Sequence, residues 1–523
     1  MLRTSGEPLS GVIQQRSDIM TTRHDSCATG RVARVAAAGL LIVASVAPTA
    51  AAQSKLPQFE RGDCLVNGDW AREVRRECGW LVVAESRDHA STNEVRLAVE
   101  IFRAREPNGA PPLVVLHGGP GNSGIQLYSA GVAMSALPEH RDVVIYDQRG
   151  AGFSEPKLCP GYERVADSAY NLREGAEKDA TLREARRACV AELNAKGIDR
   201  LAYNTTASAA DLIDLRRTLG YVSWDIRAGS YGARLAQEAM VRDGHAIRAV
   251  VLPSPVARSF SIQAEQPLST QQAFERIFAA CRLQPSCRDA FPNIGQDFYA
   301  AYDELTKSPV VVQMMRPDGR SDLVAVDGDR LVAGIRERIR AGAGLGRVPL
   351  LLHELRSGDR LRAAREVVGD GAAPAALANR ALRELVNCYD DYGPTSIETL
   401  KSANARARTP FRRPVTRDCE EWLPRFSEAS TRTPVRSDIP TLITTGYFDD
   451  RTPTEQARRI ASTLSRASLV EFPDEGHDAR PTGCHAAIVM QFLEDPTRKP
   501  DTSCVATIRP ISFATTWEPA KRP

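Results

Sequence analysis

The sequence predicts an α/β fold in which a mostly parallel sheet has helices on both faces and is interrupted by a mainly helical insertion. Three observations support this prediction. Short apolar runs alternate with segments of helical period between residues 95 and 255. Residues 256–430, here called the insert, change to helical segments with Pro- and Gly-rich joints and one strand-like piece at 310–314. Strand-like runs then return at 440–446 and 468–472, so the sheet is expected to continue after the insert.

The first 52 residues predict a secretory signal peptide. Arg31 and Arg34 precede the apolar run 35–47, and residues 50–53 read AAAQ, which offers small side chains for cleavage. The apolar run is too short for a bilayer, which takes about 20 residues to cross. We therefore expect export to a periplasm or to the medium after cleavage at residue 52, with no membrane span in the mature chain.

Composition narrows the class of protein and of partner. The chain has 523 residues, of which 42% are hydrophobic and 25% charged, with a net charge of +3. These values are typical of a soluble globular protein with a large core, and the weak charge argues against a nucleic-acid partner. The sequence indicates no metal ion or other cofactor.

Ten cysteines follow residue 52. An even number in an exported chain, without CxxC or His-rich spacing, favours disulfides over metal ligands. Counting alone does not choose among the pairings, although sequential pairing is the simplest. The cysteines are Cys64, Cys78, Cys159, Cys189, Cys281, Cys287, Cys388, Cys419, Cys484 and Cys504.

The first half of the predicted sheet leads into two polar loops. Strands are expected at 79–84, 95–102 and 111–116, and the last of these enters the glycine-rich segment 117–121 (HGGPG). Glycines let main-chain N–H groups approach a substrate oxygen, so this loop is a candidate for half of an oxyanion hole. A further strand at 142–146 precedes Asp147 and Arg149, which we expect to hold neighbouring loops in place.

A strand, a sharp turn and a helix are predicted around Ser230. Helical periods at 160–200 and 207–219 precede the strand-like residues 225–228, and helical residues continue to 240. Ala228, Gly229 and Gly232 keep this crossing free of large side chains. Such a nucleophile elbow exposes its serine above the sheet. An ordinary turn containing a serine would look similar, so the interpretation depends on residues further along the chain.

Two later loops supply an acid and a base. Residues 446–453 (GYFDDRTP) follow one predicted strand, with Thr452 expected to cap a helix at 454–464. Residues 474–478 (DEGHD) follow the next strand and contain His477. Loops after parallel strands meet at one edge of a sheet, so both should lie near Ser230. Asp449 or Asp450 could be the acid, and His485 in a predicted helix at 484–492 is a rival base.

These residue types suit acyl transfer. A serine hydroxyl becomes a good nucleophile when an imidazole takes its proton and a buried carboxylate stabilises the imidazolium. Amides of Gly119 and Tyr231 would meet the developing oxyanion, and each such donor lowers the barrier by about 3 kcal/mol. The order serine, aspartate, histidine along the chain is that of α/β hydrolases.

The motifs HGGPG, DQRGAG (147–152), AGSYG (228–232), GYFDDRTP and EGH (475–477) resemble the α/β-hydrolase family of secreted prolyl and tripeptidyl aminopeptidases. The resemblance extends from Cys64 to Cys504. It implies a triad of Ser230, Asp449 and His477, oxyanion donors at Gly119 and Tyr231, and disulfides 64–78, 159–189, 281–287, 388–419 and 484–504.

The resemblance also suggests how substrate is held. An acidic residue of the relatives' cap binds the substrate's free amine, and Asp390 matches it best, with Asp391 and Glu420 as rivals. This sequence departs from the family at Ala228 in place of the first elbow glycine, at Asp450 in place of a usual proline, and at Pro253 in place of a frequent aspartate.

The resulting expectation is an exported serine exopeptidase acting on peptide substrates. Its parts would be a signal peptide (1–52), a first core segment (53–255), the insert as a helical cap (256–430) and a last core segment (431–523). The alternatives are a carboxylesterase or other hydrolase of small acyl substrates, and a non-catalytic binding protein on the same scaffold.

Overall fold

Strand–helix units that return to one sheet in the same direction build the centre of the fold. The computed structural model describes residues 56–88, 93–169, 175–315, 321–342, 344–369, 378–413, 418–478 and 482–517. The expected signal peptide lies outside these residues. Residues 54–523 form one compact unit.

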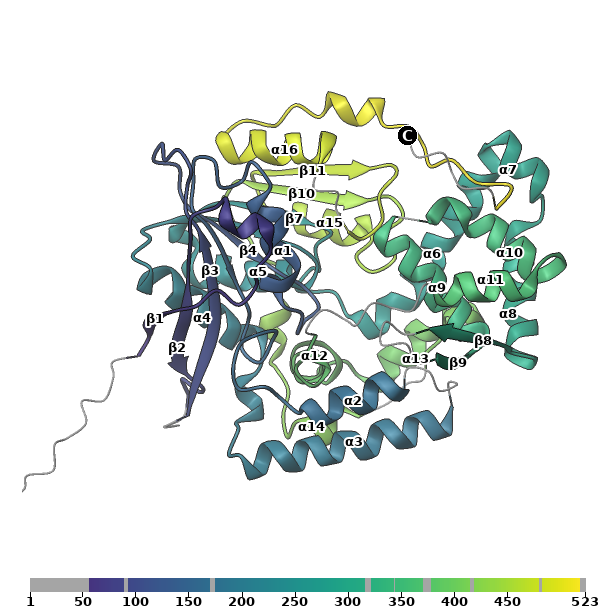
Figure 1. Cartoon of the computed structure of the whole chain (residues 1–523), viewed down its shortest axis with the longest axis horizontal. Coiled ribbons are helices and arrows are strands. Elements are labelled where there is room, and N and C mark those ends of the chain that lie inside the picture. The colour runs from purple at the N-terminus through teal and green to yellow at the C-terminus, as the bar shows by residue number, and fades with distance from the viewer. Residues whose placement is uncertain are drawn as a thin grey trace, which may run out of the picture. The chain divides into compact units, whose positions relative to one another are not determined.

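The described residues build a nine-stranded sheet in the order β1-β2-β3-β5-β4-β6-β7-β10-β11 (Figure 1). Strands β5 to β11 of this order run parallel to one another, whereas β1, β2 and β3 pair antiparallel at one side. The mostly parallel sheet predicted from the sequence is therefore confirmed. The strands are β1 Gln58–Gly62, β2 Arg76–Ala84, β3 Glu94–Phe102, β4 Leu113–Leu116, β5 Val143–Tyr146, β6 Trp224–Ala228, β7 Ile247–Pro253, β10 Thr441–Gly446 and β11 Ala467–Phe472.

Helices cover both faces of the sheet because its central strands are apolar on both sides. Val114 and Val144 pack with α4 Thr205–Thr218, α5 Tyr231–Asp243 and α15 Thr454–Ala461. Val115 and Ile145 face the other way and pack with α1 Gly124–Ala133 and α16 Gly483–Glu494. Two further helices, α2 Pro160–Ala169 and α3 Ala176–Ala195, follow β5 in the chain.

The insert lies between β7 and β10 in the chain, and many of its apolar side chains form one cluster that Phe448 and Phe513 join from outside it. It also contains a two-stranded antiparallel ribbon of β8 Val310–Met315 and β9 Ser321–Val326. The second of these strands was not expected, because the sequence indicated one strand-like piece there. The helices of the insert are α6 Ile262–Leu283, α7 Pro285–Ala290, α8 Ile294–Lys307, α9 Gly328–Ala341, α10 Val348–Ser357, α11 Arg360–Val368, α12 Arg380–Asn387, α13 Ile397–Ala405 and α14 Cys419–Trp422, with a π-helical turn at Cys388–Tyr392.

Covalent links connect neighbouring parts of the chain. Across the described residues, disulfides join Cys64 to Cys78, Cys159 to Cys189, Cys281 to Cys287, Cys388 to Cys419 and Cys484 to Cys504. These are the pairs that the family resemblance implied. None of the helices in the described ranges is both long enough and apolar enough to cross a bilayer.

Candidate active site

Ser230 occupies a strained turn between β6 and α5. Its φ of 53° and ψ of −127° lie outside the conformations that a non-glycine residue ordinarily adopts. The glycine-rich loop packs directly against this turn: a Cβ added to Gly118 would come within 2.7 Å of the Cβ of Ser230. A larger residue at 118 would therefore push the loop away from the serine.

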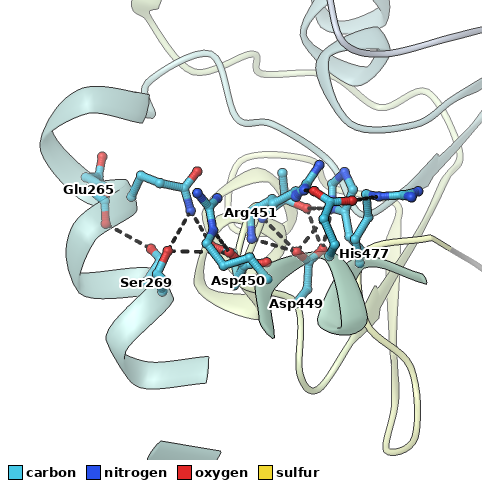
Figure 2. Close-up of polar contacts among 12 residues, drawn as sticks. Glu265, Ser269, Asp449, Asp450, Arg451 and His477 are labelled. Atoms are coloured by element: carbon cyan, nitrogen blue, oxygen red, sulfur yellow. Dashed lines mark hydrogen bonds and ion pairs between the residues drawn. The ribbon is translucent and has the colours of Figure 1, made fainter. Parts of the chain in front are cut away.

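The structure brings together the three side chains that the sequence singled out. His477 Nε2 lies 3.0 Å from Ser230 Oγ, and His477 Nδ1 lies 2.9 Å from Asp449 Oδ2. They come from the loops after β6, β10 and β11, as the rule for parallel sheets predicts. Figure 2 shows Asp449 and His477 side by side within a larger polar network.

The candidate acid, Asp449, is buried and accepts several hydrogen bonds. Asp449 is fully buried, and its Oδ1 accepts hydrogen bonds from the amides of Arg451 (2.8 Å) and Thr452 (2.9 Å). Burial alone would raise the pKa of Asp449, but the charge and hydrogen bond of His477 and the bonds from Thr452 outweigh it and hold that pKa well below its usual range. This carboxylate therefore stays ionised beside the imidazole.

The two rivals for acid and base have other partners. Asp450 is also fully buried, but its Oδ2 pairs with Arg336 Nε at 2.5 Å. His485 lies in α16, where its Nδ1 is 3.1 Å from Glu475 Oε2 and its ring stacks on Phe472. Neither side chain takes part in the contacts that join Ser230 to Asp449.

Thr452 was expected to cap α15, and this prediction is wrong. Pro453 is the N-cap residue, and α15 begins at Thr454. The Thr452 hydroxyl instead donates to Asp449 Oδ2 at 2.6 Å and lies 3.0 Å from His477 Nδ1. The sequence missed this role because a threonine before Pro is a common helix-start pattern.

The expected oxyanion donors border the serine. Tyr231 is the first residue of α5, so its amide has no acceptor within the helix. A Cβ on Gly118 would lie 3.1 Å from this amide nitrogen, which puts the loop containing Gly119 beside it. Gly119 itself has a φ of 118°, a conformation that favours glycine.

The candidate amine-binding residue, Asp390, is connected to the elbow. Its Oδ2 accepts hydrogen bonds from Thr205 N (3.0 Å) and Thr205 Oγ1 (2.6 Å). That hydroxyl also lies 2.9 Å from the phenolic oxygen of Tyr231. Burial raises the pKa of Asp390 to about 6 despite the Thr205 bonds, and the residue is 6% exposed.

The rivals of Asp390 differ in environment. Asp391 is 0% exposed, and its Oδ2 accepts a hydrogen bond from Ile262 N at 2.7 Å. Burial also raises the pKa of Asp391. Glu420 is exposed to solvent, which makes it a weaker candidate for holding a single amine.

Asp147 and Arg149 hold loops, as expected. Asp147 accepts hydrogen bonds from Ser123 Oγ (2.8 Å) and from Phe153 N (2.8 Å). Arg149 forms two 2.7 Å bonds to the buried Asp211. These contacts fix the start of α1 and the loop after β5 next to the candidate site.

One group of side chains in the described ranges has ligand atoms close enough to share a metal ion, namely Cys64, Cys78 and Glu100. Its two cysteines are joined in a disulfide. They consequently offer no thiolate, which is the form of cysteine that binds metal.

Two family models match parts of this chain. The family described as alpha/beta hydrolase fold matches residues 111–290, and the family described as TAP-like protein matches residues 408–504. A search of curated proteins gave no match.

Similar solved structures include a proline iminopeptidase from Mycobacterium smegmatis, with 16% identity over 77% of this chain and 96% of that one and a TM-score of 0.34. A proline iminopeptidase-related protein from Thermus thermophilus shares 20% identity over 77% and 91%, with a TM-score of 0.32. A thermophilic esterase from Thermogutta terrifontis shares 16% identity over 77% and 91%, with a TM-score of 0.29. The observed sheet and the match at residues 111–290 show that the chain has the α/β-hydrolase fold, and residues 408–504 match the TAP-like family.

Proposed function

We propose that this α/β hydrolase is an exported serine aminopeptidase of the prolyl or tripeptidyl type, which removes N-terminal residues from short peptides. One observation carries the proposal: His477 Nε2 lies 3.0 Å from Ser230 Oγ while its other ring nitrogen contacts the ionised Asp449. That arrangement lets an imidazole remove the serine proton and hold the resulting positive charge.

Acylation follows from these contacts. Ser230 Oγ attacks the scissile carbonyl carbon as His477 Nε2 takes the hydroxyl proton, and the carbonyl oxygen becomes an oxyanion facing the Gly119 and Tyr231 amides. His477 then gives the proton to the leaving amine as the C–N bond breaks. Asp449 remains a carboxylate throughout and orients the ring.

Deacylation repeats the proton transfers with water. His477 takes a proton from a water molecule that attacks the ester carbon of the acyl-enzyme, and returns it to Ser230 Oγ as the C–O bond breaks. The products are the released N-terminal fragment and the free enzyme, so no cofactor is needed for the balance of atoms.

Exopeptidase action is proposed from the acidic residue near the elbow. A buried carboxylate at Asp390 with a raised pKa gains a partner when a protonated amine binds beside it. A blocked amine would leave that carboxylate unpaired, which costs binding energy. We propose that the insert acts as a cap that carries this residue over the serine.

Export is proposed from the predicted signal peptide and from the cysteines. All ten cysteines after residue 52 are paired, and structural disulfides persist in oxidising compartments such as the periplasm. A signal-peptide fusion to an enzyme that is active only outside the cytoplasm would test this part of the proposal.

The test of activity compares one aminoacyl anilide with its N-acetylated form on the purified protein, with Ser230→Ala as the inactive control. The free amine should be hydrolysed at least about 100-fold faster in kcat/KM, the ratio expected when a buried charge loses its partner. A fluorophosphonate should label the wild type at Ser230.

Each of the other outcomes would contradict a different part of the proposed function. Equal rates on the two anilides would exclude the amine requirement. Rapid hydrolysis of short acyl esters with no peptide cleaved would instead support a carboxylesterase. An unlabelled Ser230 would contradict the serine mechanism itself.

A further inference from the structure

Asp450 stands where the resembled family usually has proline, directly after the candidate acid. It is fully buried, although a lone buried carboxylate is costly. The side chains that form hydrogen bonds or ion pairs with Asp450 belong to the insert. In Figure 2, the helix that carries Glu265 and Ser269 stands on one side of Asp450, and Asp449 and His477 stand on the other.

Two helices of the insert bind this one residue. Arg336 of α9 donates from Nε to Asp450 Oδ2 at 2.5 Å, and its side chain is 18% exposed. From α6, Thr270 Oγ1 lies 3.4 Å from the same oxygen, and Gln266 Nε2 donates to the Asp450 main-chain oxygen. The loop 446–453, here called the acid loop, is therefore attached to the insert through Asp450.

The ion pair has an electrostatic consequence for the neighbouring residue. Asp449 and Asp450 are adjacent and both buried, so a second unpaired negative charge there would add to the field that stabilises the imidazolium of His477. Arg336 cancels that charge. An unpaired Arg336 would act in the opposite direction and disfavour the imidazolium.

We propose that Arg336 and Asp450 form a positioning pair, which fixes the acid loop to the insert and leaves Asp449 as the single carboxylate acting on His477. This inference rests on the proposed serine mechanism but not on any choice of substrate. Neither residue touches the reacting atoms.

Other charged groups surround the two aspartates and His477 and remain in place in the variants below. Arg413 interacts electrostatically with Asp450, so one positive charge stays near this carboxylate when Arg336 is removed. Arg451 and Arg340 are paired with Glu337, and Arg340 also pairs with Asp478 beside His477. His117, in the glycine-rich loop, also interacts electrostatically with His477.

The experiment measures the rate of fluorophosphonate labelling of Ser230 as a function of pH. Asp450→Asn leaves Arg336 unpaired, so the acid limb of the profile should move to lower pH. Arg336→Met leaves Asp450 unpaired, so the acid limb should move to higher pH. Each shift should be about half a pH unit or more, and the double variant should return close to the wild-type profile.

A second buried ion pair provides the matched control. Arg216 and Asp243 are 2.9 Å apart, with side chains 8% and 3% exposed. Asp243 ends α5, a helix whose length separates it from Ser230 by about 20 Å. Asp243→Asn and Arg216→Met should lower the melting temperature without moving the acid limb.

The outcomes separate the two proposals. A wild-type protein that is not labelled at Ser230 overturns the proposed function. A labelled wild type whose Asp450→Asn and Arg336→Met profiles coincide with it, or move in the same direction, overturns the positioning pair. Shifts of opposite sign support the pair even if no peptide is cleaved.

Discussion

Two regions near Ser230 each bury a carboxylate, and they shift its pKa in opposite directions. The acid loop 446–453 contains Asp449, whose pKa is held well below its usual range. The π-helical turn Cys388–Tyr392 contains Asp390, whose pKa is raised to about 6. Both residues are almost completely shielded from solvent, so burial alone does not account for the difference.

The hydrogen-bond and charge partners of the two carboxylates explain why their pKa values differ. Asp449 faces His477 and accepts three further hydrogen bonds from Arg451 and Thr452. Asp390 accepts hydrogen bonds from the amide and hydroxyl of Thr205, and its salt-bridge partner is proposed to be the substrate. Asp449 thus has its partners before substrate arrives, whereas Asp390 is proposed to gain its counter-charge when substrate binds.

Removing the charge of Asp449 should have the largest effect on the rate of hydrolysis. Asp449→Asn keeps the shape of the side chain but loses the charge that orients and stabilises His477. We expect kcat on an aminoacyl anilide to fall about 10⁴-fold, measured at the pH optimum of the wild type. A loss below tenfold, together with a much larger loss in Asp450→Asn, would make Asp450 the acid.

Removing the charge of Asp390 should change the preference for free-amine substrates. Asp390→Asn should lower kcat/KM for free-amine peptides about 100-fold, the cost of one lost charge-assisted interaction. Hydrolysis of an ester without an amine should fall far less. Asp391→Asn is the matched control from the adjacent position, and a larger loss there would transfer the amine-binding role to Asp391.

The raised pKa of Asp390 predicts a pH dependence for free-amine substrates. Below about pH 6 the carboxylate of the free enzyme becomes protonated, whereas an α-amino group stays charged, so the ion pair is lost. The wild-type advantage over Asp390→Asn should therefore shrink about tenfold per pH unit below that value. Taking the ratio of kcat/KM for the two proteins cancels the titration of His477. A ratio that stays constant from pH 4 to pH 8 would contradict the assignment.

The sequence predicted those elements whose pattern is local. The buried strands β4 and β5 were expected because four apolar residues in a row have few alternatives beside glycine-rich loops. Strands β1 and β9 were missed. Much of β1 is polar and partly exposed, and it is a strand because it pairs with β2; β9 likewise depends on β8. Strand formation there is set by the partner and not by the segment itself.

The same distinction applies to the site. The order of Ser230, Asp449 and His477 along the chain was visible because each follows a predicted strand. The contact of Arg336 with Asp450 joins residues 114 positions apart, and no local pattern marks it. Long-range polar pairs of this kind depend on how the insert packs, which the sequence alone did not reveal.

Substituting Thr452 should have the smallest effect on kcat of these variants, and it tests the role of the acid loop most specifically. As a helix cap it would contribute mainly to stability, but its hydroxyl instead contacts Asp449 and His477. Thr452→Val keeps the shape and removes the hydroxyl, so kcat should fall about tenfold, the cost of a hydrogen bond to a charged group of about 1.5 kcal/mol, with little change in KM or melting temperature. Thr452→Ser should restore most of the rate. A variant that melts earlier yet turns over normally would return Thr452 to a structural role, and would leave the two main-chain amides and His477 as the partners that keep Asp449 charged.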